Sequence, residues 1–372
     1  MSWQSCRLGD VLTLKRGHDL PEHSRQDGDV PIVSSSGITG RHKEAKAKAP
    51  GVVTGRYGTI GEVFYLEEDY WPLNTALYVI DFKGNDPRFS SYFLRNILKG
   101  YQSEKAAVPG VDRNVLHEIK VRVPDHTSQR RITDSLSTYD DLIENNRRRM
   151  ALLEESARLL YREWFVLLRF PGHEHTRITD GVPEGWERKT LGDLCNEVRE
   201  SVSPDTLEPD TPYIGLEHIP RRSISLNDWG KVEQVTSSKH RFKAGEILFG
   251  KIRPYFHKVG VAFVDGVASS DAIVIRPVEE MLHGLVLMTV SSDGFVAVTS
   301  QTMKEGSKMP RADWKQMQTY SVPLPPSGLL NTFDGVIQPI IAQLKALTFA
   351  NQKLRTARDL LLPRLMSGEL LA

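Results

Sequence analysis

Few residues in this sequence have the types and spacing that enzyme catalysis requires. The sequence contains no Gly-x-x-x-x-Gly-Lys-Ser/Thr phosphate loop, no His-Glu-x-x-His zinc helix and no Gly-x-Ser-x-Gly nucleophile elbow. It also lacks the Asn-Pro-Pro-Tyr or Asp-Pro-Pro-Tyr tetrapeptide that amino-methyltransferases use. Residues 56–61 are glycine-rich, but no lysine and long helix follow them, so their glycines are predicted to serve turns. The sequence therefore favours a binding protein over an enzyme.

The cysteines and the paired histidines predict neither a nucleophile nor a metal site. Cys6 and Cys195 each sit near an aspartate without a histidine that would activate them, so we interpret both as buried structural cysteines. His173 and His175 have no further ligands nearby, so no metal is expected. Two cysteines cannot build a disulfide framework, which favours a reducing cytosol and predicts a cytoplasmic protein.

The charge balance excludes binding through bulk positive charge. The 372 residues include 48 Lys plus Arg and 47 Asp plus Glu, for a net charge of +1. The charged fraction of 26% and the hydrophobic fraction of 40% are typical of globular proteins, and the length predicts two domains. No run approaches the roughly 20 apolar residues of a membrane span, so no membrane partner is expected.

Local clusters of cations and aromatic residues are the best candidates for nucleic-acid contacts. Residues 239–258 contain six Lys or Arg against one Glu. Within them Lys251, Arg253, Tyr255 and His257 alternate, so on an extended segment they would share one face. Cations beside an aromatic ring form the mixture that contacts phosphates and base edges. A solvated surface loop is the alternative for this patch and for each of the others.

Smaller basic patches recur at equivalent places in both halves of the chain, which favours DNA contact over chance. The other predicted DNA-binding residues are Arg41, Lys43, Arg56, Tyr57, Lys105, Arg113 and Asn114 in the first half and Lys304, Lys308 and Arg311 in the second. Gly110 and Gly306 would let the backbone approach a ligand closely. Acidic runs at 62–69 and 193–210 predict that acidic and basic surfaces are segregated.

An internal duplication is the most informative feature of the sequence. Trp3 and Trp186 are each followed five residues later by Leu-Gly-Asp. Further matches keep their order along the chain: residues 52–56 with 247–251, 61–64 with 260–263, 74–80 with 270–275, Arg113 with Arg311, and Val123-Pro124 with Val322-Pro323. The preserved order predicts two copies of one structural plan.

Each copy is predicted to combine short strands with a little helix. Strands are expected over 52–54, 62–66 and 76–80 in the first copy and over 246–249, 260–264 and 272–275 in the second. A helix is expected over 89–98, where Asp86-Pro87 is typical of a helix start.

Each copy is followed by a long helix with an apolar seam. The seam steps alternate between three and four residues, as in a heptad repeat. The predicted pairing residues are Tyr139, Ile143, Asn146, Met150 and Leu153 in the first helix and Leu344, Leu347, Asn351 and Leu354 in the second. Two seams in one chain predict an antiparallel pair, because either seam alone would leave an apolar stripe in water.

Polar and proline residues inside the seams leave alternatives open. Asn146 and Asn351 would lie near each other in an antiparallel pair, or each would face solvent. Arg358 interrupts the second seam. Pro339 either starts the second helix or kinks it, and Pro363 is expected to end or bend its last turn.

The sequence resembles the specificity (S) subunit of a type I restriction-modification system. The resemblance covers the whole chain and rests on Gly181-Val182-Pro183-Glu184-Gly185-Trp186 with Leu191-Gly192-Asp193, on Gly245-Glu246-Ile247-Leu248 running into Lys251-Ile252-Arg253-Pro254-Tyr255, on Gly58-Thr59-Ile60-Gly61, and on the Val-Pro segment before Ser128-Gln129-Arg130-Arg131-Ile132. The second helix departs from the pattern, because it opens with Pro326-Ser327-Gly328 where the first has Gln129.

The resemblance implies an α+β fold with two pseudo-repeated mixed α/β target recognition domains, separated by two long antiparallel helices that form a coiled-coil-like spacer. The implied divisions are recognition domains at 1–126 and 181–325, conserved helices at 127–170 and 326–372, and a linker at 171–180. It further implies a non-catalytic subunit that binds a bipartite, asymmetric site on double-stranded DNA. Two methyltransferase (M) subunits would supply S-adenosylmethionine, and restriction (R) subunits would use ATP and magnesium. A helical scaffold that never touches DNA is the alternative.

Overall fold

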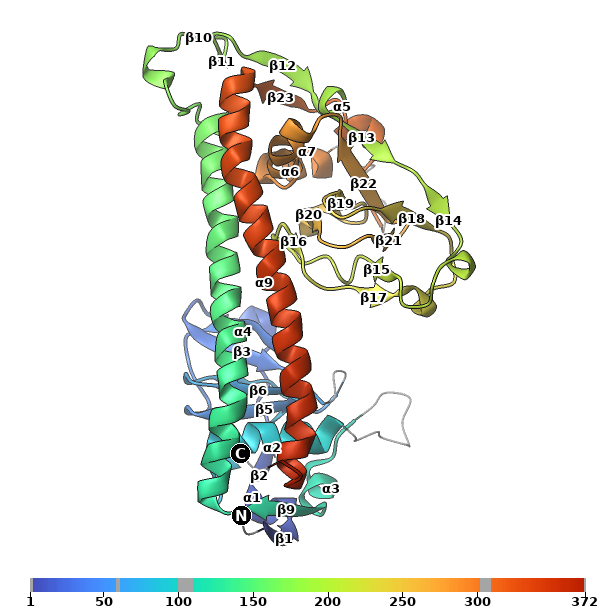
Figure 1. The fold of residues 1–372 in the computed structure, drawn as a ribbon. Coiled ribbons are helices and arrows are strands. Elements are labelled where there is room, and N and C mark those ends of the chain that lie inside the picture. The colour runs from blue at the N-terminus through green and yellow to red at the C-terminus, as the bar shows by residue number, and fades with distance from the viewer. Residues whose placement is uncertain (1–2, 58–60, 100–109, 302–308, 371–372) are drawn as a thin grey trace. The chain divides into compact units, whose positions relative to one another are not determined.

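The computed structural model describes residues 3–57, 61–99, 110–301 and 309–370 of the chain. Within them the fold divides into two compact units. Unit 1 comprises Met1–Ile143 together with Lys353–Ala372, and unit 2 comprises Glu144–Gln352. The boundary between the units cuts both long helices, so each unit contains a part of each helix (Figure 1).

Unit 1 is built on an antiparallel four-stranded sheet of strand order β2-β8-β5-β6. Its strands are β2 (Thr13–Arg16), β8 (Ala76–Asp81), β5 (Gly51–Gly55) and β6 (Val63–Leu66). A second sheet has the order β4-β3-β7, from β3 (Val30–Ser34), β4 (Gly37–His42) and β7 (Trp71–Pro72). A ribbon of β1 (Trp3–Arg7) and β9 (Lys120–Pro124) joins the short helices α1 (Leu8–Val11) and α3 (Arg113–His117).

Unit 2 repeats this plan with an enlarged sheet of order β13-β22-β19-β20-β16. Its strands are β13 (Cys195–Val198), β22 (Ala272–Pro277), β19 (Ile247–Gly250), β20 (Val259–Ala262) and β16 (Ser225–Leu226). A second sheet of order β14-β18-β21-β15-β17 is formed by Ser201–Val202, Lys239–Phe242, Gly266–Ala268, Pro212–Ile214 and Gly230–Lys231. The ribbon of β12 (Glu187–Thr190) and β23 (Ser321–Leu324) accompanies α5 (Leu191–Leu194) and α8 (Trp314–Met317).

The strand register establishes which residues of the two units are equivalent. Gly55 lies opposite Ala76, and Gly250 lies opposite Ala272, so the predicted match of Ala76 with Ala272 is confirmed. Three other matches are displaced by a few residues. Val63 faces Thr54 and Val259 faces the equivalent Phe249, so Val63 is equivalent to Val259, and the predicted match of 61–64 with 260–263 is displaced by three residues. Tyr57 bridges Gly110 whereas Ile252 bridges Arg311, so Arg311 is equivalent to Gly110 and not to Arg113.

The same register corrects the proline match near the end of each unit. Arg7 pairs with Lys120, and Thr190 pairs with Ser321. Counting from these pairs, Pro124 is equivalent to Pro325, whereas the sequence comparison aligned it with Pro323. Short insertions in the second copy therefore shift the equivalent residues along the sequence.

Helix α2 (Pro87–Lys99) confirms the helix predicted after Asp86-Pro87. The Asp86 carboxylate accepts a 2.6 Å hydrogen bond from the Phe89 amide, and so caps an otherwise unpaired donor of the first turn. Proline fits the first helical turn, which has no partner for an amide hydrogen. The helix buries Phe89, Tyr92 and Phe93 against the sheet of unit 1.

The two long helices occupy most of the predicted ranges 127–170 and 326–372. Helix α4 (His126–Tyr161) continues into a π-helical turn, Arg162–Val166. Helix α9 (Ser327–Ser367) runs through both Pro339 and Pro363. Of the alternatives that the sequence left open, the structure therefore excludes a helix start at Pro339 and a helix end at Pro363. Tertiary packing offsets the hydrogen bonds that each proline removes from the helix, because Leu344, shortly after Pro339, and Leu362, next to Pro363, are buried.

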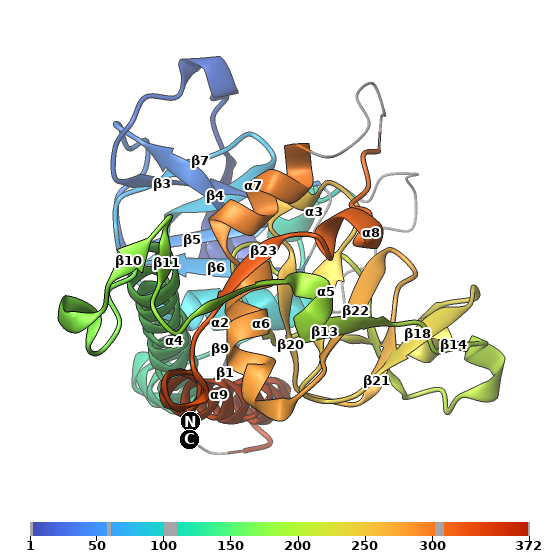
Figure 2. The same ribbon diagram turned by 90° about the horizontal axis from the view of Figure 1, so that it is seen from above.

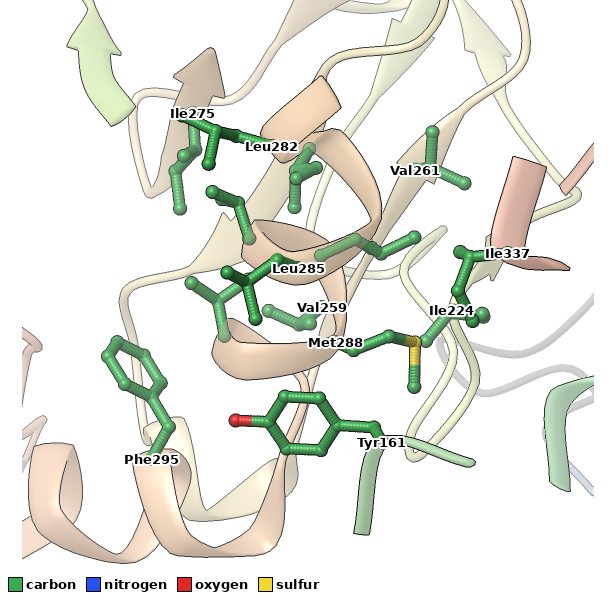
Figure 3. Close-up of a cluster of buried hydrophobic side chains, with 14 of the residues drawn as sticks. Tyr161, Ile224, Val259, Val261, Ile275, Leu282, Leu285, Met288, Phe295 and Ile337 are labelled. Carbon is green, nitrogen blue, oxygen red and sulfur yellow. The ribbon is translucent and has the colours of Figure 1, made fainter. Parts of the chain in front are cut away.

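The core of unit 2 surrounds one short apolar helix, α6 (His283–Val290), followed by α7 (Asp293–Gln301). Every residue of α6 after His283 is buried, as expected for a helix enclosed on all sides. Leu285 and Met288 pack toward Tyr161 of α4 and Ile337 of α9 (Figure 3). Seen from above, α6 lies beside β20 (Figure 2). Both long helices are thus part of this core.

Among the described residues, no single helix is both long and apolar enough to cross a membrane. Only the bent pair Glu280–Val290 and Asp293–Gln301 meets that criterion of length and composition, with an angle of 64° between its helices.

Candidate nucleic-acid interface

Three arginines of unit 1 line a pocket of about 500 Å³ at the ends of its sheet strands. Arg16 ends β2, Arg56 follows β5, and Arg113 begins α3. Tyr57, 44% exposed, forms part of the wall, and the Arg56 guanidinium lies 4.6 Å from the centre of its ring. The sequence predicted Arg56, Tyr57 and Arg113 but not Arg16, because Arg16 comes beside them through the pairing of β2 with the distant strand β8.

A backbone bridge holds this pocket together. The Val111 amide donates a 2.8 Å hydrogen bond to the Arg56 carbonyl, and a Cβ at Gly110 would lie 2.9 Å from the Tyr57 ring. Gly110 is therefore required for close approach of Tyr57, whereas the sequence had assigned it to the approach of a ligand. Asn114 lies one residue beyond Arg113, and its amide donates to the Asp112 carboxylate, which caps α3.

The residues around Arg41 form a different kind of surface. The Arg41 side chain donates to the Asp29 carbonyl and lies 3.9 Å from a Glu68 carboxylate oxygen. Lys48 forms a 2.6 Å ion pair with Asp69. Lys43 is exposed, and no ion pair of Lys43 is found among the described residues. Of the two predicted contacts in this loop, the structure leaves Lys43 available and holds Arg41 in internal interactions.

The structure corrects the prediction that Lys251, Arg253, Tyr255 and His257 share one face of an extended segment. Pro254–Phe256 form a 3-10 turn, and Arg253 and His257 on either side have φ values of 50° and 54°. This turn exposes Arg253 and Tyr255 and buries His257, which is 7% exposed. Proline at 254 fits the start of a helical turn, and here it begins one, so the segment is not extended.

His257 is a structural residue. Its Nε2 lies 2.7 Å from the Ser291 carbonyl, and its own carbonyl accepts from the Arg222 amide. Burial lowers the pKa of His257, partly offset by the hydrogen bond to Ser291, so the neutral imidazole donates to this carbonyl. His257 fixes the end of the turn and is removed from the predicted contacts.

The exposed part of the turn is a basic and aromatic surface. The Phe256 ring lies 4.1 Å from the Arg221 guanidinium and 5.8 Å from that of Arg253. Tyr255, 52% exposed, packs edge-on against the same ring. Neither arginine has an ion pair among the described residues. Arg221 and Phe256 were missed by the sequence, because the cation–π geometry joins two separate loops.

The remaining predicted cations of unit 2 are paired internally or lie elsewhere. Lys251 lies 3.8 Å from Glu197, and Arg311 forms a 3.2 Å ion pair with Asp271. Gly245, Gly250 and Lys251 have the spacing of a phosphate loop, but the residues between them form β19 and Ile252 follows. Lys105, Lys304 and Lys308 lie outside the described residues.

The expected segregation of acidic and basic surfaces was wrong. Glu68 and Asp69 from the first acidic run lie beside Arg41 and Lys48. Glu200, from the second run, lies 3.4 Å from Arg241. The acidic runs thus neutralise several of the cations around them. Among the described residues, no ion pair is formed by Arg16, Arg56, Arg113, Arg221 or Arg253.

The predicted seam residues lie between α4 and α9, and a polar contact joins the helices in each unit. In unit 2 the Asn146 amide donates a 2.9 Å hydrogen bond to the Asn351 carbonyl oxygen, and Met150 is buried beside Asn351. In unit 1 Arg358 pairs with Asp140 at 2.5 Å. The apolar seam residues Ile143 and Leu344 are buried, whereas Tyr139, Leu153, Leu347 and Leu354 are half-buried.

No nucleophile or metal site is evident among the residues that the structure describes. No group of three or more His, Cys, Asp or Glu there could hold a metal ion. Burial raises the pKa of the Cys195 thiol to about 12, so it is protonated and unreactive. Cys6 is half-buried rather than buried, and burial also raises the pKa of its thiol.

Comparison with known proteins places the duplication in a family. Residues 1–155 and 183–355 each match the family described as the type I restriction modification DNA specificity domain. The chain is 22% identical over 306 residues to the type I restriction enzyme MjaIX specificity subunit of Methanocaldococcus jannaschii, covering 75% of this chain and 66% of that relative. It is 21% identical over 355 residues to the type I restriction enzyme EcoDI specificity subunit of Escherichia coli, covering 88% and 78%.

A solved structure supports the fold. The crystal structure of a type I restriction-modification system S subunit from M. genitalium superposes with a TM-score of 0.57 at 14% identity, covering 98% of this chain and 96% of that one. The resemblance found in the sequence is confirmed by these matches. The chain therefore belongs to the family of type I restriction modification DNA specificity domains, which matches it in two segments.

Proposed function

We propose that this chain is the DNA sequence-recognition subunit of a type I restriction-modification complex and has no catalytic activity of its own. The observation that carries the proposal is the repetition of one fold with two different basic surfaces. Unit 1 presents Arg16, Arg56 and Arg113, and unit 2 presents Arg221 and Arg253 around Phe256. Two unlike surfaces would read two unlike half-sites, so the DNA target is bipartite and asymmetric.

The long helices are proposed to act as a coiled-coil-like spacer. Helix α4 has 36 residues and α9 has 41. At about 1.5 Å per residue, each is longer than the roughly 34–36 Å of one DNA turn. Helices of this length could hold two reading surfaces at the spacing of successive grooves.

The proposed partners are double-stranded DNA, two M subunits and R subunits, in the cytoplasm. S-adenosylmethionine would be bound by the M subunits, and ATP and magnesium by the R subunits. The names of the curated relatives, all specificity subunits of type I restriction enzymes, support assembly into such a complex. A helical scaffold without DNA contact is the competing function; the exposed cation–π surface around Phe256 opposes it.

Mapping methylated adenines tests the proposal directly. The host genome would be sequenced for methylated adenine with the chain present, deleted and restored. We expect methylation at one two-part asymmetric motif that disappears on deletion and returns on restoration. A methylation pattern that is the same without the chain would contradict the proposed function.

A variant of the exposed turn separates DNA recognition from scaffolding. Arg253→Ala and Arg221→Ala remove exposed guanidiniums without removing a buried group. We expect an intact complex that methylates its motif less, because the cations beside Phe256 are lost. Lys345→Ala, which removes an exposed cation of α9 in the same unit outside the predicted contacts, is a control for general loss of charge. Unchanged DNA affinity of the double variant would favour the scaffold.

A further inference from the structure

The two units carry equivalent groups of cations, and among the described residues those of unit 2 are paired with carboxylates whereas those of unit 1 are not. Register relates the sites residue by residue: Leu14 faces Val79 across the sheet of unit 1, and Glu197 faces Ile275 across that of unit 2. Because Ala76 is equivalent to Ala272, Val79 is equivalent to Ile275. Leu14 is therefore equivalent to Glu197, and Arg16, two residues on, is equivalent to Arg199.

The equivalence extends to the second strand and to the loop that bridges it. In unit 1 the Arg56 carbonyl accepts a 2.8 Å hydrogen bond from the Val111 amide. In unit 2 the Lys251 carbonyl accepts a 2.8 Å hydrogen bond from the Ala312 amide at the equivalent place. Arg56 is thus equivalent to Lys251. Asp112 and Asp313, the next residues, both cap the helices that follow. Beyond them, Arg113 is equivalent to Trp314.

The cations in unit 2 are neutralised from within. One Glu197 carboxylate oxygen lies 2.6 Å from Arg199, and the other lies 3.8 Å from Lys251. The Glu197 side chain is 7% exposed, so its charge is held in the site rather than in solvent. Arg311 is paired with Asp271. Three cations of this site therefore face carboxylates, and the bulky Trp314 stands where unit 1 has Arg113.

The equivalent cations in unit 1 have no such partner in the described part of the chain. Leu14 stands where unit 2 has its bridging glutamate, and Leu14 is buried in the apolar core. Among the described residues, Arg16, Arg56 and Arg113 form no ion pair, although all three line the same pocket. Of the described residues that line the pocket, Asp112 alone is acidic, and its carboxylate accepts a hydrogen bond from the Asn114 amide.

We propose that the arginine pocket of unit 1 binds one phosphate group, and that Glu197 occupies the equivalent place in unit 2 as an internal substitute for that phosphate. The inference rests on the proposed function, because the phosphate considered is a DNA backbone phosphodiester. Guanidinium groups suit a tetrahedral oxyanion, and three arginines line a pocket of about 500 Å³. Unit 1 thus supplies more salt-sensitive affinity than unit 2.

A matched pair of variants tests the pocket. Arg16→Ala and Arg199→Ala remove structurally equivalent, exposed arginines. Affinity of the full-length chain, purified with any subunits that assemble with it, would be measured on a 30-base-pair duplex across NaCl concentrations. We expect Arg16→Ala to reduce the slope of log affinity against log salt by about one, the effect of one lost phosphate contact, and Arg199→Ala to leave it unchanged. Equal slopes for the two variants would overturn the proposal.

Glu197 and the source of the phosphate are tested separately. Glu197→Gln, which keeps the size of the side chain, should steepen the slope by about one because Arg199 and Lys251 are released. An unchanged slope would overturn the role assigned to Glu197. Inorganic phosphate would also be titrated into the wild-type chain and Arg16→Ala without DNA. Tight phosphate binding lost in Arg16→Ala, with no change in the DNA slope, would identify a free anion and reject the DNA backbone.

The two proposals fail in different ways. A wild-type complex with no salt-dependent affinity for duplex DNA would reject the proposed function, and the phosphate titration would still decide the pocket. A wild-type complex that binds DNA while Arg16→Ala keeps its slope would reject the pocket alone. Thermal unfolding of each variant, with Arg16→Gln as a second substitution, controls for loss of fold.

Discussion

Asn146 of α4 donates a 2.9 Å hydrogen bond to Asn351 of α9, inside a largely apolar seam. Asn351 is 5% exposed and its amide also lies 4.0 Å from the Met150 sulfur. A buried amide pair costs apolar contact but is satisfied only when the helices keep one register. The pair therefore selects one alignment of the two helices within unit 2.

Breaking this pair should destabilise unit 2. Asn351→Ala leaves the partly buried Asn146 amide without its acceptor, at a cost of about 1–3 kcal/mol in unfolding free energy. The double variant Asn146→Leu with Asn351→Leu should recover that stability and lose the register constraint. Urea unfolding measures the first effect, and disulfide trapping between cysteines placed along α4 and α9 measures the second. Equal stability of Asn351→Ala and wild type would contradict the role of the pair.

The ion pair of Arg358 with Asp140 should contribute to unit 1 in the same way. Asp140 also accepts a 2.7 Å hydrogen bond from Tyr92 of α2, so it joins three helices. We expect Arg358→Met to reduce the unfolding free energy by about 2 kcal/mol, because a half-buried carboxylate loses its cation. Asp140→Asn and the double variant complete a cycle. Additive losses in that cycle would show that the two side chains do not interact.

Glu154 should be the most sensitive polar residue of α4. Its buried carboxylate accepts from the Ser223 and Ser225 hydroxyls at 2.7 and 2.6 Å and from Arg158 at 3.2 Å. Glu154→Ala leaves these donors unsatisfied and is expected to cost about 2 kcal/mol. Glu154→Gln keeps one acceptor and should cost less. Chemical unfolding of both variants checks the order, and Glu155→Ala, one residue on and exposed, is the matched control.

His257 should make unit 2 sensitive to acid. Burial lowers the pKa of His257 below its usual 6.5, with Arg222 and Arg158 lowering it further and Ser291 and Asp293 raising it. The unfolded chain therefore binds a proton at a higher pH than the folded chain. The full contribution of neutral His257 to the unfolding free energy is present above about pH 6.5, and it is lost as the pH drops toward the folded pKa. Between pH 7.5 and 5, the melting temperature of His257→Gln should change less with pH than that of wild type.

The spacer proposal predicts a change in target geometry. Removing seven residues from the α4 seam and seven from the facing part of α9 keeps the seams paired and shortens both helices by about 10 Å. We expect the permitted gap between the two half-sites to shrink, or binding to be lost. Mapping methylated adenines in cells with the shortened chain reads the gap directly. An unaltered target would reject the helices as a ruler.

The elements that local pattern controls could be predicted, and those that depend on distant partners could not. The strand at Ile247–Gly250 follows from an apolar run of Ile, Leu and Phe. The helix after Asp86 follows from a capping residue with proline. The course of α9 through Pro339 does not, because packing against α6 and α4 outweighs the local cost of proline.

The candidate site shows the same division. Arg56, Tyr57 and Arg253 were recognisable as cations and an aromatic residue near glycines. His257 was misassigned, since alternation in sequence implies a shared face only on an extended backbone. Arg16 and Arg221 carried no local signal, and the pairing of Glu197 with Lys251 joins residues 54 positions apart.

The return of α9 to unit 1 has a consequence for synthesis of the chain. Leu362, Leu365 and Met366 are buried in the same apolar cluster as Leu8 and Leu136. A ribosome makes these three residues after it has made all of unit 2, so the N-terminal part leaves the ribosome without a complete core. Chains emerging in order usually fold their first domain first. Here that order is reversed: unit 2 can close while the earlier-made surface of unit 1 still awaits its last helix.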